Sequence, residues 1–207
     1  MPKLFQFVII SAIFALFLSF GSFVYSAPPA GFQKTTLISS GLNNPTGFEI
    51  LPDGRVFIIE QTGAIKLYKN GQLLAQPFDV LPAKGENDRG LLGIAVDPLF
   101  SSNNYLYFRY VGLDDKHHVV RYVATGDAAT QNPVEIYSTD YSQASNHAGG
   151  SIQFGPDEKL YISFGDSNTG SSQDLGTVIG KVIRINNDGT IPSDNPYVGQ
   201  SGEQQLF

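Results

Sequence analysis

Apolar and polar residues alternate along much of this 207-residue chain, most clearly in its second half. Residues 150–154 alternate, the turn Gly155–Asp157 follows, and residues 160–164 alternate again. A period of two predicts two short strands joined by a turn. Because a hairpin returns both of its ends to the same edge of a sheet, we expect His147 and Asp166, which flank the two runs, to lie within reach of each other.

The pair His147 and Asp166 is the strongest candidate for chemistry in the chain. A carboxylate beside an imidazole fixes one tautomer of the ring and supports the ring as a general base. A His at the end of a strand and an Asp after a Gly are also common as plain loop and turn residues. Both interpretations stay open on these two residues alone, and the remainder of the chain leads us to predict that they are catalytic.

Strand-like runs also dominate the part of the chain that precedes this hairpin. Phe48–Leu51, Val56–Ile59 and Ile65–Tyr68 are short apolar runs, separated by turn residues at Pro52–Gly54 and by Gly63. Few stretches after the N-terminal segment are long and periodic enough for a helix. The sequence therefore predicts an all-β fold.

The order of apolar run, Pro- or Asp-containing turn and apolar run occurs three times, with turn prolines at Pro52, Pro98 and Pro156. A repeat of about 40 to 50 residues with four strands is typical of a β-propeller blade, and insertions between blades lengthen it. We therefore predict a β-propeller of four-stranded antiparallel blades, with three blades present and the start of a fourth left open. Because propellers close with about 4 to 8 blades, we expect the chain to be a fragment of a longer protein.

Residues 1–26 have the composition of a secretory signal peptide. Lys3 is followed by the apolar run Leu4–Phe20 and then by small residues. The run is at the lower limit for spanning a membrane, so an uncleaved signal anchor that tethers the protein is the alternative. We expect a signal peptide at 1–26, an N-terminal spacer and first strand at 27–40, and a partial propeller domain at 41–207.

Composition limits where the protein works and what it binds. The chain has no cysteine and therefore no disulfides, which suits the periplasm or the outside of a bacterium better than a eukaryotic extracellular setting. Its formal net charge is −6, which offers no basic surface for DNA or RNA. We therefore expect an exported, periplasmic or extracellular protein that has no nucleic-acid partner and no membrane span after signal removal.

Four phrases of the sequence carry a resemblance to a known family. They are GLNNPTGFEILPDGRVFIIEQTGAIKLY, DRGLLGIAVDPLF, NHAGGSIQFGPDEKLYISFGD and GKVIRINNDGTIPSDNP. Any one phrase would be weak evidence, but the four occur in one order between about Gly41 and about Pro196. With them the chain resembles the glucose/sorbosone dehydrogenase family, whose best-known branch comprises soluble quinoproteins that oxidise aldose sugars with pyrroloquinoline quinone (PQQ).

The resemblance implies a fold and an activity. The implied fold is a six-bladed β-propeller, about three blades of which are present, with PQQ at the mouth of the central channel. The implied reaction is oxidation of aldose sugars to lactones in the full-length protein. A general base at the position of His147 takes the proton of the anomeric hydroxyl of this small-molecule substrate, hydride passes to the quinone, and Asp166 orients the base. An electron acceptor such as a cytochrome would follow.

Asp88, Arg89 and Asn146 are the expected cofactor-binding residues. In the quinoprotein branch the position of Asp88 is a Gln that contacts the cofactor, and an ionised Asp would repel anionic PQQ unless it is protonated or paired. Arg89 could offer donors to a carboxylate of PQQ, or Asp88 and Arg89 could pair with each other at the surface. Both interpretations stay open. The family's later cofactor and calcium motifs would follow GTIPSDNP and are absent from this sequence, so binding of PQQ and Ca²⁺ by this chain is in doubt.

The same scaffold could also act without catalysis, as a propeller that binds carbohydrate or protein at the cell surface. Asp88 favours this alternative. His117 and His118 lie near carboxylates and suggest a metal site, but neighbouring residues on a strand point to opposite faces. We therefore assign no metal ligands and expect these two His residues in a solvated loop between strands.

Overall fold

The computed structural model describes residues 28–207, so the predicted signal peptide at 1–26 lies outside the described residues. Most of the described chain forms one compact unit, Ile38–Phe207. This unit consists almost entirely of antiparallel strands arranged in three sheets. The all-β class predicted from the alternating pattern is therefore confirmed.

The stretch that precedes the first sheet is irregular. Residues 28–40 contain a turn in which the Phe32 N–H donates to Pro29 O (3.0 Å), and they contain no strand. The first strand that we expected within 27–40 is therefore wrong, because antiparallel pairing begins only at Pro45. In the described part of the chain, no helix combines the length and the apolar character needed to cross a membrane.

Residues 45–80 form the first sheet, in which β1, β2, β3 and β4 are neighbours in that order and β5 also pairs with β3. Its strands are β1 (Pro45–Ile50), β2 (Val56–Glu60), β3 (Ala64–Lys69), β4 (Gln72–Leu73) and β5 (Asp79–Val80). The turn between β1 and β2 is closed by Asp53, whose Oδ1 accepts the Arg55 N–H (3.0 Å). The three strand-like runs predicted for this region are confirmed.

Residues 91–138 form the second sheet, with strand order β6-β7-β8-β9. Its elements are β6 (Leu91–Val96), the short helix α2 (Phe100–Asn103), β7 (Tyr105–Val111), β8 (His117–Val123) and β9 (Val134–Ser138). All neighbouring strands are antiparallel. Nearly every residue of β7 is buried, which shows that both faces of this sheet are covered.

Residues 149–185 form the third sheet, with strand order β10-β11-β12. Its elements are β10 (Gly149–Phe154), β11 (Leu160–Phe164), the 3₁₀ turn η1 (Ser171–Gln173) and β12 (Val182–Ile185). The predicted hairpin is confirmed, because Ile152 on β10 pairs with Ile162 on β11. Leu206 bridges to Ile183 on β12, so the last residues return to the third sheet and do not start a fourth.

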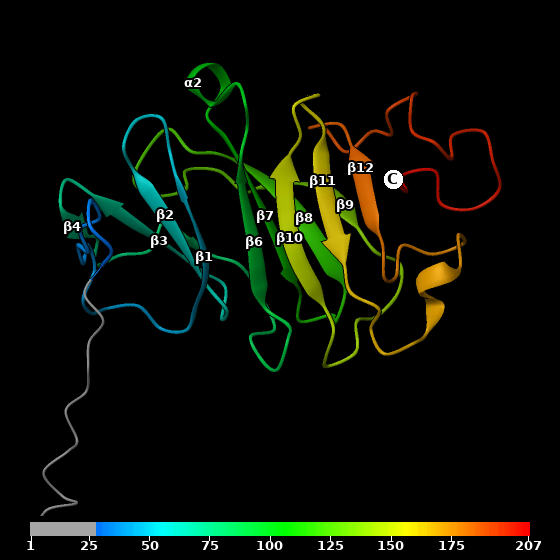
Figure 1. The fold of residues 1–207 in the computed structure, drawn as a ribbon, viewed down its shortest axis with the longest axis horizontal. Coiled ribbons are helices and arrows are strands. Elements are labelled where there is room, and N and C mark those ends of the chain that lie inside the picture. The colour runs from blue at the N-terminus through cyan, green and yellow to red at the C-terminus, as the bar shows by residue number, and fades with distance from the viewer. Residues whose placement is uncertain (1–27) are drawn as a thin grey trace, which may run out of the picture. The chain divides into compact units, whose positions relative to one another are not determined.

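The three sheets follow one another with β1, β6 and β10 as adjacent inner strands (Figure 1). Thr46 Oγ1 on β1 donates to Leu91 O on β6 (2.7 Å). Gly93 on β6 approaches β10 so closely that an added Cβ would collide with Gly150 O, which explains the need for glycine at this crossing. This arrangement confirms the predicted β-propeller of antiparallel blades, and we call the sheets the first, second and third blade.

Two hydrophobic clusters join the blades. The first cluster contains Phe57 of the first blade together with Phe108 of the second, and the second cluster contains Tyr107 of the second blade together with Ile162 of the third. Because side chains alternate along a strand, the neighbours Tyr107 and Phe108 on β7 point to opposite faces. The second blade is therefore packed on both sides, and this packing fixes the inner strands that border the candidate site.

Candidate active site

His147 and Asp166 lie at the two ends of the β10–β11 hairpin. His147 precedes β10 and has a left-handed backbone (φ 58°), and Gly149 continues the turn with a φ of 72°. Asp166 follows β11 directly after Gly165. The structure brings the two side chains together, with His147 Nδ1 2.7 Å from Asp166 Oδ1, which is the distance of a charge-assisted hydrogen bond.

This hydrogen bond fixes the state of the His147 ring. A carboxylate can only accept, so Nδ1 of the neutral imidazole carries the proton and Nε2 keeps its lone pair. The side chain is 54% exposed, and no group within residues 28–207 forms a hydrogen bond with Nε2. Hydrogen bonds from the Asn168 N–H and from His147 hold the pKa of the Asp166 carboxyl below its usual value, so the carboxyl is ionised at neutral pH. The exposed Nε2 can therefore accept a proton.

Asp88 supports the backbone of the loop that carries His147. Its Oδ2 accepts the His147 N–H (2.8 Å), and its own N–H donates to Ser145 O (3.2 Å). The loop before β6 thus crosses to the loop before β10 and joins the second blade to the third. We expected Asp88 to face a cofactor or to pair with Arg89, and the structure instead gives its carboxylate a contact with the backbone of the candidate base.

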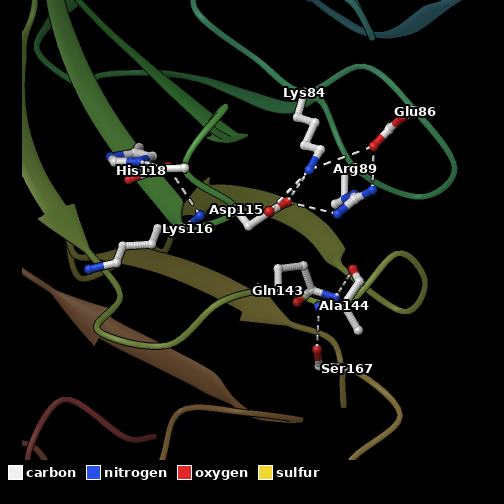
Figure 2. A network of polar contacts seen from close by, with 10 residues as sticks. Lys84, Glu86, Arg89, Asp115, Lys116, His118, Gln143, Ala144 and Ser167 are labelled. Atoms are coloured by element: carbon white, nitrogen blue, oxygen red, sulfur yellow. Dashed lines mark hydrogen bonds and ion pairs between the residues drawn. The ribbon is translucent and has the colours of Figure 1, made fainter.

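Arg89 is held by two other carboxylates (Figure 2). Its Nη2 donates to Glu86 Oε1 (2.5 Å), its Nη1 donates to Asp115 Oδ1 (2.7 Å), and the residue is only 8% exposed. Lys84 Nζ donates to the same Asp115 carboxylate (2.8 Å). Within the described residues Arg89 forms no ion pair with Asp88, so a local pair between them is wrong. Nη1 and Nη2, which the sequence predicts to meet a cofactor carboxylate, are thus engaged by carboxylates of the protein, and the buried Nε has no hydrogen-bond partner within the described residues.

Hydrogen bonds to backbone atoms hold the loop around His147, and they involve Asn146, Gln143 and Ser167. Asn146 is exposed, and its carbonyl accepts a hydrogen bond from Gln143 Nε2 (2.9 Å). Ser167 is buried; its Oγ accepts the Ala144 N–H (2.9 Å) and its N–H donates to His147 O (3.3 Å). The sequence pattern did not indicate Gln143 or Ser167. The one available signal was the position of Ser167 directly after the candidate carboxylate.

His117 and His118 lie on β8 and point to opposite faces of the second blade. His117 is fully buried, whereas His118 lies between Glu135 (Nδ1 to Oε2, 2.6 Å) and Asp114 (Nε2 to Oδ1, 3.0 Å). The solvated loop that we expected for both is wrong, because β8 pairs with β7 and β9 along this stretch. Across residues 28–207, no three His, Cys, Asp or Glu side chains gather in a way that could hold a metal ion.

An open groove lies between the inner strands of the three blades. Its volume is about 170 Å³, and residues of β1, β6 and β10 line it, among them Phe48, Gly93 and Gly150. Gly150 lies close after His147 in the chain. The strand β10, which begins two residues after His147, therefore forms part of the wall of this groove.

The polar groups around His147 do not fit an anionic tricarboxylate such as PQQ. Asp88 and Asp166 present carboxylates, and the cations Lys84 and Arg89 already pair with carboxylates of the chain. Arg109, whose Nη2 donates to Ala148 O beside His147, is fully buried and therefore out of reach of a cofactor. Recognition of the anion would require a free guanidinium or ammonium group. The residues described here therefore do not form a PQQ site by themselves.

Comparison with known proteins identifies related sequences and structures. A sequence model described as Glucose / Sorbosone dehydrogenase matches residues 42–207. Quinoprotein glucose dehydrogenase B of Acinetobacter calcoaceticus is 29% identical over 206 residues, which cover 82% of this chain and 42% of that protein. The structure of the PQQ-bound form of aldose sugar dehydrogenase from Streptomyces coelicolor has 30% sequence identity and a TM-score of 0.72, and the match covers 84% of this chain and 54% of that one.

A further relative is named for binding and not for an enzyme activity. Hedgehog-interacting protein of Homo sapiens is 28% identical over 200 residues, which cover 80% of this chain and 28% of that protein. This chain spans about half the length of the two dehydrogenases and less than a third of the interacting protein. What the complete relatives do therefore bears on the function of this chain only as a proposal.

Proposed function

The chain belongs to the glucose/sorbosone dehydrogenase family, and we propose that the protein oxidises aldose sugars to lactones with His147 as the general base. The observation that carries this proposal is the exposed Nε2 of His147, which the hydrogen bond from Nδ1 to Asp166 (2.7 Å) leaves ready to accept a proton. The names of the related aldose sugar dehydrogenase and quinoprotein glucose dehydrogenase support the substrate class.

Oxidation of the anomeric hydroxyl removes a proton from the oxygen and a hydride from the carbon. Nε2 of His147 takes the proton, so that the electrons of the broken O–H bond form the carbonyl as the hydride leaves. The imidazolium produced lies beside ionised Asp166, whose negative charge stabilises it. The contacts of Asp88 and Ser167 to the His147 backbone hold the loop that carries the ring.

The hydride requires an oxidant, and PQQ, which the Streptomyces coelicolor relative binds, is a quinone that accepts hydride when bound. Because the charges around His147 do not fit PQQ, a quinone site in the whole protein requires cationic donors in addition to those described here. We assign no residue of this chain to PQQ or to Ca²⁺. In this proposal Asp88 and Asn146 stabilise the loop that carries His147. A further electron acceptor such as a cytochrome stays a prediction.

Dye reduction by the full-length protein tests the enzymatic proposal. Protein reconstituted with PQQ and Ca²⁺ should reduce an artificial electron acceptor in the presence of aldoses. His147→Gln should lower kcat by at least about 100-fold, because a general base contributes about 10² to 10⁴ to the rate. His118→Gln, a matched substitution on β8, should keep the wild-type rate. A wild-type protein that takes up no quinone, or a His147→Gln protein with full turnover, would refute the proposal.

A second candidate function is that the propeller binds carbohydrate or protein without turnover. The carboxylate of Asp88 beside the candidate base and the similarity to Hedgehog-interacting protein favour it. Calorimetric titration of the full-length protein with glycans, followed by analysis of the recovered glycan, separates the two functions. Saturable binding with unchanged glycan, in the presence of PQQ and Ca²⁺, would support the binding module. Conversion of the sugar to its lactone would exclude it as the main function.

We also propose that residues 1–26 direct export, which the basic Lys3 and the apolar run Leu4–Phe20 support. Mass spectrometry of the N-terminus, after separation of membrane, periplasmic and secreted fractions, tests this proposal. A mature N-terminus at Ala27 in a soluble fraction is the expected result. Intact residues 1–26 in the membrane fraction would indicate the tethered alternative, and intact protein in the cytoplasm would contradict export.

A further inference from the structure

A buried arginine lies beneath the loop that carries the candidate base. Arg109 on β7 is fully buried (0% exposed), and within the described residues it forms no ion pair with a carboxylate. Its Nη2 donates to His117 Nδ1 (2.8 Å) and to Ala148 O (2.8 Å), and its guanidinium packs against the ring of Phe164 (5.1 Å). Burying a cation is costly unless it is paired and hydrogen-bonded, and within the described residues Nε and Nη1 of Arg109 have no hydrogen-bond partner. The bonds that Nη2 does make, one of them to Ala148 next to His147, therefore show what the buried cation holds in place.

Arg109 determines the direction of the next hydrogen bonds. A guanidinium can only donate, so Nδ1 of His117 accepts and the proton of the neutral ring sits on Nε2. Nε2 then donates to Gln143 Oε1, which lies 2.8 Å away. Burial, followed by the charge of Arg109, lowers the pKa of His117 to about 3, which keeps the ring neutral at physiological pH. The direction of this chain of hydrogen bonds is therefore fixed by a single permanent charge.

Gln143 passes this direction to the backbone around His147. Because Oε1 accepts from the His117 ring, the amide nitrogen must face the other way, and Nε2 donates to Ala144 O (3.0 Å) and to Asn146 O (2.9 Å). Figure 2 shows Gln143 next to Ala144 in this loop. Gln143 thus holds Asn146 O before His147, and Arg109 holds Ala148 O after it. Both donors are buried side chains.

We infer that Arg109, His117 and Gln143 form a buried relay that positions the His147 loop from the interior of the protein. Asp88 and Ser167 add hydrogen bonds to the backbone of His147 itself. None of the three relay residues contacts the imidazole of His147 through its own side chain, so they are positioning residues. The left-handed backbone of His147 (φ 58°) is an uncommon conformation that the surroundings must maintain, and the relay supplies three of the contacts that do so.

Gln143→Glu is the most selective change to the relay, because it keeps the size of the side chain and replaces the N–H donors with a carboxylate oxygen. One carboxylate oxygen can still accept from His117. The other faces the carbonyl oxygens of Ala144 and Asn146, to which it cannot donate a hydrogen bond. The loop should therefore lose its support while the core stays packed. Gln153→Glu, on an exposed position of β10, introduces the same charge change without touching the relay and is the matched control.

Amide hydrogen exchange of the full-length protein measures the result. In Gln143→Glu the amides of His147 and Ser167 should exchange at least about tenfold faster, because each lost buried hydrogen bond weakens local closure. The amides of β11 should keep their protection, and Gln153→Glu should exchange like wild type at the two loop amides. Unchanged exchange at His147 and Ser167 in a folded Gln143→Glu protein would overturn the inference.

A measurement on the unchanged protein keeps the inference testable if the variant fails to fold. In protein labelled with ¹⁵N at histidine, His117 should appear as the neutral Nε2–H tautomer between about pH 5 and 8. A protonated ring, or the Nδ1–H tautomer, would overturn the relay. The catalytic consequence of the relay rests on the proposed function, but neither measurement requires activity. If both measurements gave the expected results in a protein without turnover, the proposed enzymatic function would fail and the relay would stand.

Discussion

Two imidazoles are held in opposite tautomers by the partners of their Nδ1 atoms. Nδ1 of His147 faces Asp166, which can only accept, and Nδ1 of His117 faces Arg109, which can only donate. Nε2 is consequently a free acceptor in the exposed ring and a donor in the buried ring. The same side chain thus serves as the candidate base at the surface and as a structural link beneath it.

Asp166→Asn tests whether the carboxylate prepares the exposed ring for catalysis. An amide can present either an acceptor or a donor to Nδ1, so it no longer imposes the tautomer that leaves Nε2 free, and it carries no charge to stabilise an imidazolium. We expect kcat of the reconstituted full-length protein to fall by about 100-fold with an unchanged melting temperature. Asp174→Asn, in the same exposed loop region, is the control and should keep the wild-type rate. Wild-type turnover by Asp166→Asn would show that the carboxylate is not needed.

His117 should make the protein less stable in mild acid. Its pKa is lowered from 6.5 to about 3 in the folded protein, so below about pH 6.5 the unfolded chain binds a proton that the folded chain does not. Stability therefore falls as the pH drops through this window, by about 2 kcal/mol between pH 7 and pH 5. His117→Gln can still accept from Arg109 and donate to Gln143, and it should lack this loss. Urea unfolding of both proteins at the two pH values measures the difference, and parallel losses would contradict the prediction.

At the level of elements, the sequence predicts the strands of the site better than its loops. The alternation in residues 150–154 and 160–164 is a local, periodic signal, and it correctly brought His147 and Asp166 to one edge of a sheet. The partners of the loop have no such signal. Asp88 is far from His147 in the sequence, and only the packing of the second blade against the third brings the two together.

The same limit explains the errors around β8. His117 and His118 follow two acidic residues and read as a polar loop, but β8 begins at His117 because this stretch pairs with β7 and β9. Tertiary pairing overrode the local composition there. Arg109 carries no signal in the sequence that would place it in the interior, and it is buried because both faces of β7 are covered.

Gly165, between β11 and Asp166, should be intolerant of a side chain. A Cβ at this position would collide with His147 O and lie 2.8 Å from Gly149 N, both of which are backbone atoms that cannot move without opening the hairpin end. We expect Gly165→Ala to lower the free energy of unfolding by roughly 2 kcal/mol or more and to reduce kcat. Gly126→Ala, where the nearest atom lies at 3.6 Å, is the control and should be close to neutral. Denaturant unfolding would contradict this prediction if both variants behaved alike.

At the level of the whole molecule, the spacing of turn prolines predicted three blades, and the described part of the chain forms three. The strands can be predicted because the alternation of apolar and polar residues is a local signal. The order of the blades can be predicted because the same run-turn-run order occurs three times. The last residues could not be predicted in this way. Leu206 pairs with Ile183 although the chain between them contains no periodic pattern, so the return of the chain to the third blade is a consequence of tertiary structure.

The two hydrophobic clusters imply that the three blades unfold together. Because β7 contributes Phe108 to one cluster and Tyr107 to the other, a loss of packing in the first blade should reach the third blade through the second. Phe57→Ala removes a fully buried ring from the first cluster and should cost about 3 to 5 kcal/mol. If the blades are one cooperative unit, the amides of β12 should lose protection against hydrogen exchange by the same free energy.

Phe48→Ala is the matched control for this experiment, because Phe48 lies in the same blade and is 64% exposed. Its effect on stability should stay within about 0.5 kcal/mol. Full protection of Ile183 and Ile185 in Phe57→Ala would show that the third blade opens on its own. In that case the His147 loop, which belongs to the third blade, would be insensitive to damage in the first. A shared loss would instead mean that the geometry of the candidate base depends on packing that is two blades away.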